Sequence, residues 1–384
     1  MANKPRFEGE RVRLSDVCIL VMGQSPSSAS YNSDGMGLPF YQGNADFGDT
    51  HPIAKTWCTD PKKIAEPGDV LISVRAPIGS INVANEKCCI GRGVAAMRPH
   101  NELVSGPYLV HLLRSNRKTL EAIGTGSTFK AIGKKALSNF KVNLYSLAEQ
   151  LSISKKLEQT LVCIKLGELQ LSHLDNLVKS RFVEMFGDLC EGETIYPPRS
   201  IEDLCSDFLG GGTPSMKHPE YFGGEIPFIK SGDVKNRIVC EGDLSITKEG
   251  LLNSSAKLIP TGAVIVVIRS GILKHTLPVA LVGCEVAINQ DIKALIPASG
   301  VNSLYLQWAL LVSEPLILSR VRATTADNIE TKQLRKYMIP LPPLALQEEF
   351  ADFVAAVDKS RFVIQQQIDK LKTLYDSLAQ EYFS

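Results

Sequence analysis

The sequence lacks an apolar run long enough to cross a membrane. Its longest apolar stretches, at 17–22, 263–268 and 308–312, are far shorter than the roughly 20 residues that a membrane-spanning helix needs. The N-terminal run MANKPRFEGE also lacks the apolar core of a signal peptide. Nine cysteines are present, but none forms a C-x-x-C pair or clusters with histidine at metal-binding spacing. This pattern argues against a disulfide framework and a structural zinc site, so we expect a cytoplasmic protein with reduced thiols and no metal site.

Catalytic motifs are missing as well. There is no G-x-S-x-G elbow, no Asn/Asp-Pro-Pro-aromatic tetrapeptide of an adenine methyltransferase and no Pro-Asp dipeptide of a nuclease. The nearest approach to a phosphate-binding loop is 124–135, where Thr128 replaces the first glycine and Lys135 replaces the hydroxyl residue. We interpret this segment as a Gly/Ser loop that caps a short helix, or alternatively as a basic loop that meets a DNA backbone. The sequence therefore predicts no catalytic residue and no cofactor bound by this chain.

Neither sign of charge is in excess over the whole chain, because 42 Lys and Arg face 41 Asp and Glu. The charges are nevertheless unevenly distributed. Residues 1–145 carry a net charge of +6 and residues 196–343 a net charge of +1, whereas 146–195 and 344–384 each carry −3. Basic globular parts joined by acidic segments permit a polyanion to bind the globular parts.

The chain contains two copies of one unit. Residues 144–150 (LYSLAEQ) match residues 341–347 (LPPLALQ) at an offset of 197. Upstream, 69–75 (DVLISVR) matches 263–269 (AVIVVIR) after small gaps. Such self-similarity is the sequence signature of a repeated architecture, so both halves of the chain are expected to fold in the same way.

The first part of each copy, roughly 10–145 and 198–343, is predicted to consist of strands and loops. It is rich in Gly, Pro and short β-branched runs such as 70–74 and 264–268, which are typical of short strands bounded by turns. A helix is expected within each copy, at 108–117 and 304–318.

The second part of each copy, roughly 147–186 and 344–382, contains no proline and repeats apolar residues in steps of four and three. This heptad pattern predicts one long helix in each copy, interrupted in the second helix only by Arg361. Each helix could pack on its own domain, but we favour pairing of the two helices because neither has a domain large enough to cover it. The apolar positions are Ile153, Leu157, Ile164, Leu171, Leu174, Val178 and Met185 in the first helix, and Phe350, Val354, Val357, Ile364, Ile368, Leu371, Tyr375 and Leu378 in the second.

Several segments, taken together, resemble the specificity (S) subunits of type I restriction–modification systems. The resemblance covers nearly the whole chain and rests on the combination of segments rather than on any one of them. The segments are 67–79 (PGDVLISVRAPIG), 90–97 (IGRGVAAM), 126–130 (GSTFK), 137–142 (LSNFKV) and 147–150 (LAEQ) in the first copy, and 288–293 (INQDIK) and 337–343 (YMIPLPP) in the second.

The resemblance implies two target-recognition domains, each reading one half of a bipartite, asymmetric DNA sequence. It implies an α+β fold in which the two domains are joined by two long helices that pair as an antiparallel coiled coil with pseudo-twofold symmetry. The expected divisions are target-recognition domain 1 at 1–145, a spacer helix and linker at 146–195, target-recognition domain 2 at 196–343 and a second spacer helix at 344–384.

The resemblance also implies partners. The spacer helices would set the gap between the DNA half-sites and dock methyltransferase (M) subunits, and endonuclease (R) subunits would join that complex. S-adenosylmethionine, ATP and magnesium would be used by those partner subunits, which accounts for the missing catalytic motifs. Two helices of about 36 residues would span roughly 54 Å, which exceeds one DNA turn of about 34–36 Å.

Base-reading candidates follow from residue type, because Arg and Lys pair with guanine and Asn and Gln with adenine in the major groove. In the first copy they are Gln24, Gln42, Asn44, Arg75 and Arg92, with Lys130, Lys134 and Lys135 on phosphates. In the second copy they are Lys230, Arg269, Lys274, His275, Asn289 and Gln290, with Arg320, Arg322 and Lys332 on phosphates.

Two alternatives stay open at this level. Arg75 and Arg269 recur at matched positions after a strand, so each could instead pair with a carboxylate and serve the fold. The whole chain could also be a coiled-coil scaffold whose globular parts bind proteins rather than DNA, or an enzyme whose site is unrecognised.

Overall fold

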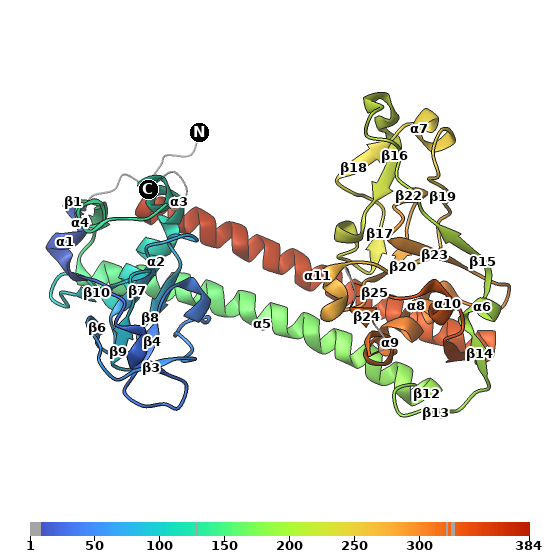
Figure 1. The fold of residues 1–384 in the computed structure, drawn as a ribbon, viewed down its shortest axis with the longest axis horizontal. Coiled ribbons are helices and arrows are strands. Elements are labelled where there is room, and N and C mark those ends of the chain that lie inside the picture. The colour runs from blue at the N-terminus through green and yellow to red at the C-terminus, as the bar shows by residue number, and fades with distance from the viewer. Residues whose placement is uncertain (1–8, 127–129, 320–321, 324–326) are drawn as a thin grey trace. The chain divides into compact units, whose positions relative to one another are not determined.

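The computed structural model describes residues 9–126, 130–319, 322–323 and 327–384, which form two compact units (Figure 1). Unit 1 comprises Met1–Leu169 and Gln365–Ser384, and unit 2 comprises Gln170–Ile364. Each unit therefore contains one globular domain and part of both long helices.

Unit 1 is built around a four-stranded antiparallel sheet. Its strand β10 (Val94–Pro99) lies between β2 (Cys18–Met22) and β7 (Val70–Ser73), and β8 (Ile81–Val83) pairs with the other side of β7. All four residues of β7 are buried. Its side chains point alternately into two hydrophobic clusters, so that Val70 and Ile72 enter one and Leu71 the other. This explains why an apolar run rather than an alternating pattern forms the strand.

The second sheet of unit 1 has five short strands in the order β3 (Tyr31–Asn32), β5 (Trp57–Cys58), β4 (Leu38–Tyr41), β9 (Cys88–Ile90) and β6 (Ile64–Ala65). Within it, β4 and β9 are parallel. The remaining elements of the domain are β1 (Glu10–Arg13) paired with β11 (Lys141–Leu144), and the helices α1 (Leu14–Val17), α2 (Gly106–Ser115), α3 (Arg117–Ala122) and α4 (Lys134–Ser138).

Unit 2 repeats this plan. Its central strand β20 (Val264–Val267) is also fully buried and pairs antiparallel with β23 (Ile292–Pro297) and β21 (Val279–Val282) in a five-stranded sheet. In the second sheet, β16 (Phe222–Ile229) and β22 (Val286–Ile288) are parallel, as β4 and β9 are in unit 1. The duplication read from the sequence is therefore present in the folded domains.

The other strands of unit 2 extend these two sheets or form separate two-stranded sheets. The short strands are β12 (Gly187–Asp188), β13 (Glu193–Thr194), β14 (Pro198–Ser200), β15 (Cys205–Gly210), β17 (Ile238–Val239), β18 (Leu244–Ile246), β19 (Leu258–Ile259), β24 (Arg322–Ala323), β25 (Asp327–Asn328) and β26 (Met338–Pro340). The helices are α6 (Ile201–Leu204), α7 (Lys248–Leu252), α8 (Ser303–Val312), α9 (Glu314–Leu318) and α10 (Thr331–Arg335).

The helix expected at 304–318 is two helices, α8 and α9. Pro315 stands in the first turn of α9, where its missing N–H is harmless. Ser313 ends α8 and leads into α9. Proline is tolerated at the start of a helix but not in its interior, which explains why the apolar run does not form one continuous helix.

The two long helices are α5 (Leu147–Phe186) and α11 (Leu344–Phe383), of 40 residues each, which confirms the predicted ranges. Their starts are anchored identically. The buried amide of Gln150 bonds Ser105 N, Leu103 O and Tyr145 O at 2.7–2.9 Å. Its counterpart Gln347, 197 residues later, makes the three matching bonds to Asn302 N, Gly300 O and Pro342 O. This is the structural role of the repeated L-A-x-Q motif.

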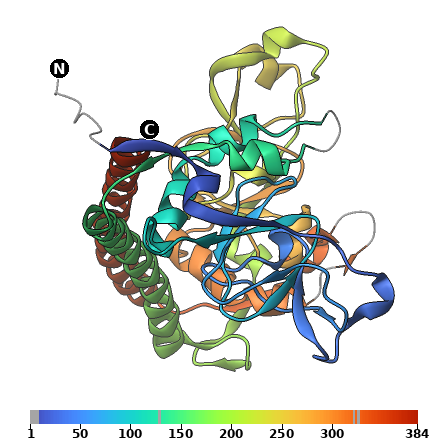
Figure 2. The same ribbon diagram turned by 90° about the vertical axis from the view of Figure 1, so that its left-hand side faces the viewer.

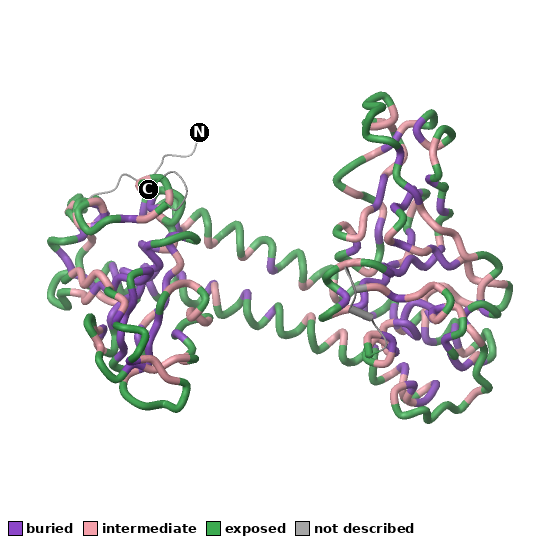
Figure 3. Tube along the Cα trace, viewed as in Figure 1, coloured by how far each residue is buried: buried purple, intermediate pink, exposed green. Residues whose placement is uncertain are grey.

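Within each unit the two long helices lie side by side and antiparallel (Figures 1 and 2). In unit 1 the start of α5 meets the end of α11, where Lys156 Nζ lies 3.5 Å from the Tyr382 hydroxyl. Nearer the middle of both helices, Lys372 Nζ lies 3.1 Å from Glu168 Oε1. In unit 2 the end of α5 meets the start of α11, where Arg181 bonds Glu349 at 3.0 Å. Buried positions recur along both helices (Figure 3), as the heptad pattern predicts.

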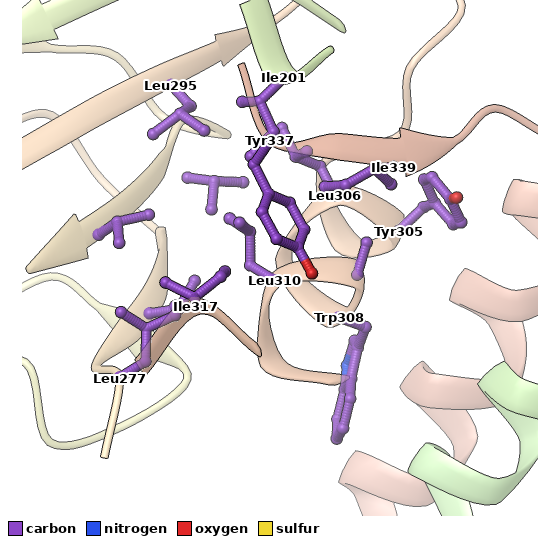
Figure 4. Close-up of a cluster of buried hydrophobic side chains, with 14 of the residues drawn as sticks. Ile201, Leu277, Leu295, Tyr305, Leu306, Trp308, Leu310, Ile317, Tyr337 and Ile339 are labelled. Carbon is purple, nitrogen blue, oxygen red and sulfur yellow. The ribbon is translucent and has the colours of Figure 1, made fainter. Parts of the chain in front are cut away.

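The helices also complete the cores of the domains, so both packing modes considered from the sequence occur. Phe182 and Phe350 lie in the main core of unit 2, with ring centroids 5.4 Å apart. Ile153 and Phe383 lie in the main core of unit 1. Figure 4 shows the domain side of the unit 2 core, where Trp308 and Tyr305 of α8 are buried.

Candidate nucleic-acid interface

In unit 1 the ends of four strands meet at one edge. Because β4 and β9 are parallel and pair Tyr41 with Ile90, the residues that follow them, Gln42 and Arg92, emerge next to each other. The backbone of Gln24, after β2, donates to Ile90 O at 3.0 Å. The backbone of Val74, after β7, donates to Gly93 O at 2.9 Å. These contacts bring residues from distant parts of the sequence to one place.

Four predicted base-reading residues surround a surface hollow of about 500 Å³ at this edge, which we name the unit 1 hollow. Gln42, Arg75 and Arg92 are exposed and Asn44 is half-buried. Asp46 also lines the hollow, but its Oδ2 accepts hydrogen bonds from Gln42 N at 2.6 Å and Gly43 N at 3.3 Å. The hollow therefore presents guanidinium and amide groups, which are the groups that pair with purine edges in DNA.

The predicted phosphate-contacting segment runs beside the hollow. Ala131 forms a β-bridge with Arg75, and Ile132 N donates to Val74 O at 2.9 Å. Lys130 is exposed next to this bridge, and Lys134 and Lys135 are exposed at the start of α4. Residues 127–129 of the same loop lie outside the described residues. The segment considered as a phosphate-binding loop thus leads into a helix of only five residues and adds positive charge beside the hollow.

Unit 2 has the same convergence of strand ends. The parallel pair β16–β22 places Lys230 beside Asn289, whose backbone N donates to Ile229 O at 3.0 Å. Ile268 N donates to Asp291 O at 2.8 Å, and Arg269 forms a β-bridge with Asn328. That bridge matches the bridge between Arg75 and Ala131, since Arg269 corresponds to Arg75 at an offset of 194 and Asn328 to Ala131 at an offset of 197.

The side chains at this edge of unit 2 are more strongly paired. Arg269 forms an ion pair with Asp291, and the buried Asn289 donates from Nδ2 to the same carboxylate at 3.0 Å. Gln290 Oε1 accepts a 2.7 Å hydrogen bond from Thr213 Oγ1, and Lys230 Nζ lies 3.5 Å from Asp243. Asn289 therefore holds Asp291 in the free chain rather than facing the surface.

The other predicted residues of unit 2 lie around this edge. Lys274 and His275 are exposed at the end of a 3₁₀ helix (Gly271–Lys274) that follows Arg269. Lys332 is exposed in α10. Arg320 lies outside the described residues, and Arg322 belongs to β24.

Sequence reasoning did not single out the acidic residues that shape these edges. Asp46 and Asp233 each accept hydrogen bonds from the backbone that follows a parallel strand, in unit 1 from Gln42 N and in unit 2 from Lys230 N at 2.8 Å. Asp291 orients Arg269. Alignment of the two copies could have revealed Asp291, because it aligns this acidic residue of the second copy with Gly93 of the first.

Neither a membrane span nor a metal-binding cluster is present in the described residues. Among the described helices none is long and apolar enough to cross a membrane. In the same part of the chain, no three His, Cys, Asp or Glu side chains gather as they would around a metal ion.

Comparison with known proteins gives consistent matches. Residues 8–174 and 196–373 each match the family described as type I restriction modification DNA specificity domain. The chain is 43% identical over 139 residues to a specificity subunit assigned to the type I restriction enzyme MjaX of Methanocaldococcus jannaschii, which covers 36% of this chain and 33% of that protein. It is 34% identical over 154 residues to the type I restriction enzyme EcoR124I/EcoR124II specificity subunit of Escherichia coli, which covers 39% of this chain and 38% of that protein. These alignments therefore span 33% and 38% of the two relatives' own lengths.

Solved structures match over the whole chain. One is a chain from a structure of complex assembly and conformational transition in a type I R-M system, with a TM-score of 0.61, 19% identity and coverage of 100% of this chain and 99% of that chain. Another is the type I restriction-modification S subunit of M. genitalium, with a TM-score of 0.55, 12% identity and coverage of 100% and 98%. At these identities the structures establish the shared fold.

Proposed function

Because the chain belongs to the family of type I restriction–modification specificity subunits, we propose that each of its two units reads one half of a bipartite, asymmetric DNA site. The observation that carries this proposal is the repeated convergence of strand ends with unlike side chains. Gln42 and Arg92 of unit 1 stand where unit 2 has Lys230 and Gln290. The two units share one backbone arrangement but carry different hydrogen-bonding side chains at their strand ends, and this combination suits two DNA half-sites of different sequence.

Base reading falls to the side chains at the edges and phosphate binding to the lysines around them. Arg75 and Arg92 can each donate two hydrogen bonds to guanine, and Gln42 and Asn44 can each pair with adenine. Lys130, Lys134 and Lys135 contact phosphates, which position the protein without carrying sequence information. The comparisons give no support to a scaffold without DNA specificity.

The long helices set the gap between the two half-sites and dock the methyltransferase subunits. A helix of 40 residues is about 60 Å long, which exceeds one turn of DNA at about 34–36 Å. The helices bring a net negative charge of −3 in each of the segments 146–195 and 344–384, which disfavours direct contact with DNA phosphates and leaves their surfaces to protein partners.

The chemistry belongs to the partners. Methyltransferase subunits use S-adenosylmethionine to methylate adenine at N6, and endonuclease subunits use ATP and magnesium to translocate and cleave DNA. This chain binds none of these cofactors and contributes the choice of site. The assembled complex acts on DNA in the cytoplasm.

The test is to co-express the chain with its neighbouring methyltransferase subunit and to map N6-methyladenine across the host genome by single-molecule sequencing. We expect a bipartite motif with a constant gap, which disappears when the gene for this chain is deleted. Exchange of residues 1–145 for the matching domain of a relative should change one half of the motif and leave the other intact. A stably assembled complex that methylates no defined motif would contradict the proposal and favour the scaffold.

A further inference from the structure

Four charged side chains meet in unit 2 where the domain packs on both long helices. Arg237, which precedes β17, bonds Asp175 of α5 at 2.8 Å and lies 3.4 Å from Asp358 of α11. Arg361 of α11 bonds the same Asp175 and lies 3.8 Å from Asp358. We name these four residues the charge cluster. It joins three elements, carries two positive and two negative charges, and contains one acid from each helix.

The arginines of the cluster are held firmly. The side chain of Arg237 is only 20% exposed, and that of Arg361 is only 25% exposed. The Arg237 guanidinium carbon lies 4.9 Å from the centroid of the Trp308 ring. The backbone carbonyl of Arg237 accepts a hydrogen bond from Leu281 N at 2.7 Å. Arg361 Nη1 also donates to Leu171 O of α5 at 3.1 Å. Arg237 is therefore fixed to the domain, and Arg361 is fixed across the two helices.

Arg361 is the residue that interrupts the heptad series of α11, between Val357 and Ile364. A polar residue in an apolar seam lowers stability but selects one register, because it needs its partner opposite. Breaking such a partly buried pair is strongly unfavourable, since the remaining charge is left without a partner. Sliding α11 along α5 would separate Arg361 from Asp175, and Arg237 could not follow because its backbone belongs to the domain.

The cluster is not a requirement of the fold, because unit 1 lacks it. At the repeat offset of 197, Arg361 corresponds to Ile164, Asp358 to Leu161 and Trp308 to His111. These three residues line a hollow of about 920 Å³ in unit 1. The corresponding place in unit 1 thus folds without an arginine at the position of Arg361 or an acid at that of Asp358, and its ion pair between the domain and α5, Lys165 with Asp49, uses other positions.

We propose that Asp175, Arg237, Asp358 and Arg361 hold α5 and α11 in one stagger, fix the unit 2 domain on them, and thereby restrict the protein to one gap between its two DNA half-sites. They act as positioning residues and touch no base. This inference rests on the proposed function. The charge cluster has a different role from helix length. Helix length sets which gap between the half-sites is preferred, whereas the charge cluster controls how many different gaps are accepted.

The test uses two variants of the full chain, each assembled with the methyltransferase subunit and analysed by methylation mapping. The first replaces all four charges by apolar residues (Asp175→Leu, Arg237→Met, Asp358→Leu, Arg361→Leu), because replacement of a whole ionic cluster preserves packing better than removal of one member. The second is Asp358→Asn, which removes only the most weakly paired member and leaves the fold little affected. The matched control is Glu168→Gln with Lys372→Met, an exposed pair that also joins α5 to α11.

We expect both variants to keep the two half-site sequences of the motif and to methylate sites whose gap differs by one base pair at least tenfold more than the unaltered chain does. The control should accept one gap only. A gap that remains single in Asp358→Asn, and in the fourfold variant if that assembles, overturns the inference. Absence of any bipartite motif with the unaltered chain would instead overturn the proposed function, so the two failures are distinguishable.

Discussion

Arg269 and Asp291 are bound to each other at the edge of unit 2 where its strand ends meet, and there Arg269 Nε donates to Asp291 Oδ1 at 2.7 Å and Nη2 lies 2.6 Å from the same oxygen. In unit 1 the residue that corresponds to Arg269 is Arg75, and the residue that corresponds to Asp291 is Gly93. A Cβ on Gly93 would meet Gln42 O at 2.1 Å, so the backbone admits no carboxylate there. Among the described residues Arg75 has no ion-pair partner. The carboxylate pairing considered from the sequence is therefore confirmed for Arg269 only.

The Arg269–Asp291 pair predicts a change of specificity confined to one half-site. In Asp291→Ala, Arg269 becomes free to reorient, and its preference among base pairs at its position should change by roughly tenfold, since one bidentate contact contributes about 1–3 kcal/mol. Competition binding of the assembled complex to oligonucleotides that vary one base pair at a time measures this. The control is Glu202→Gln in α6, which breaks an exposed ion pair with Arg335 of α10. A uniform loss at every position, or no change, would count against base reading by Arg269.

Lys134 provides a test of the phosphate contacts. Lys134→Ala should weaken binding of the complex to specific and unrelated DNA alike, because a phosphate contact carries no sequence information. The plot of log affinity against log salt concentration should lose about 0.9 from its slope for the one phosphate no longer neutralised. Lys370→Ala, at an exposed position of α11, should leave the slope unchanged. The role assigned to Lys134 is wrong if its variant keeps the full salt dependence.

The spacer function predicts a measurable change in the gap. Insertion of one heptad between Leu169 and Gln170 and another between Ile364 and Gln365, where the two units divide, lengthens each helix by about 10 Å. The charge cluster and the Lys372–Glu168 pair both remain on their own sides of the insertions. Methylation mapping should show a gap longer by about three base pairs at about 3.4 Å each. The same insertion in α5 alone should abolish methylation, because α5 would then be seven residues longer than α11 and the helix contacts of both units could not form together. An unaltered gap in the double insertion would rule out the helices as the spacer.

Unit 1 should lose stability in mild acid because of His111. This side chain is buried in α2, its Nδ1 lies 3.2 Å from the Tyr375 hydroxyl of α11, and burial together with the nearby Arg114 lowers its pKa to about 4. Unfolded histidine has a pKa of about 6.5, so the unfolded chain takes up the proton first. The contribution of neutral His111 is complete above about pH 6.5 and is lost progressively toward pH 4. From these two pKa values the loss at pH 5 is about 2 kcal/mol.

Urea unfolding at pH 7 and pH 5 checks this expectation. His111→Gln keeps a polar partner for Tyr375 but cannot take up a proton, so its midpoint should fall less between the two pH values than that of the unaltered chain. His173→Gln, on the exposed side of α5, should behave like the unaltered chain. Equal pH dependence in all three proteins would show that folding does not lower the pKa of His111.

Much of the site depended on non-local geometry that residue type alone could not supply. Gln42, Asn44, Arg75 and Arg92 were chosen because their side chains suit base edges, yet they are separated by up to 50 residues of sequence. They meet because β4 and β9 are parallel neighbours and because Val74 bonds Gly93. Strand pairing of this kind joins distant segments and leaves no local pattern.

The sequence by itself determined the duplication, the ranges of the two long helices and the apolar strands at the centre of each domain. These features are repeated or periodic along the chain, and the spacing of apolar residues reflects which side of a helix or strand is buried. Only the tertiary structure decided that Arg269 has a carboxylate partner while Arg75 has none among the described residues, and that Arg361 joins Asp175 and Arg237. The physical reason is that an ion pair depends on a few ångströms between side chains brought together by packing, and the order of residues along the chain does not encode such distances directly.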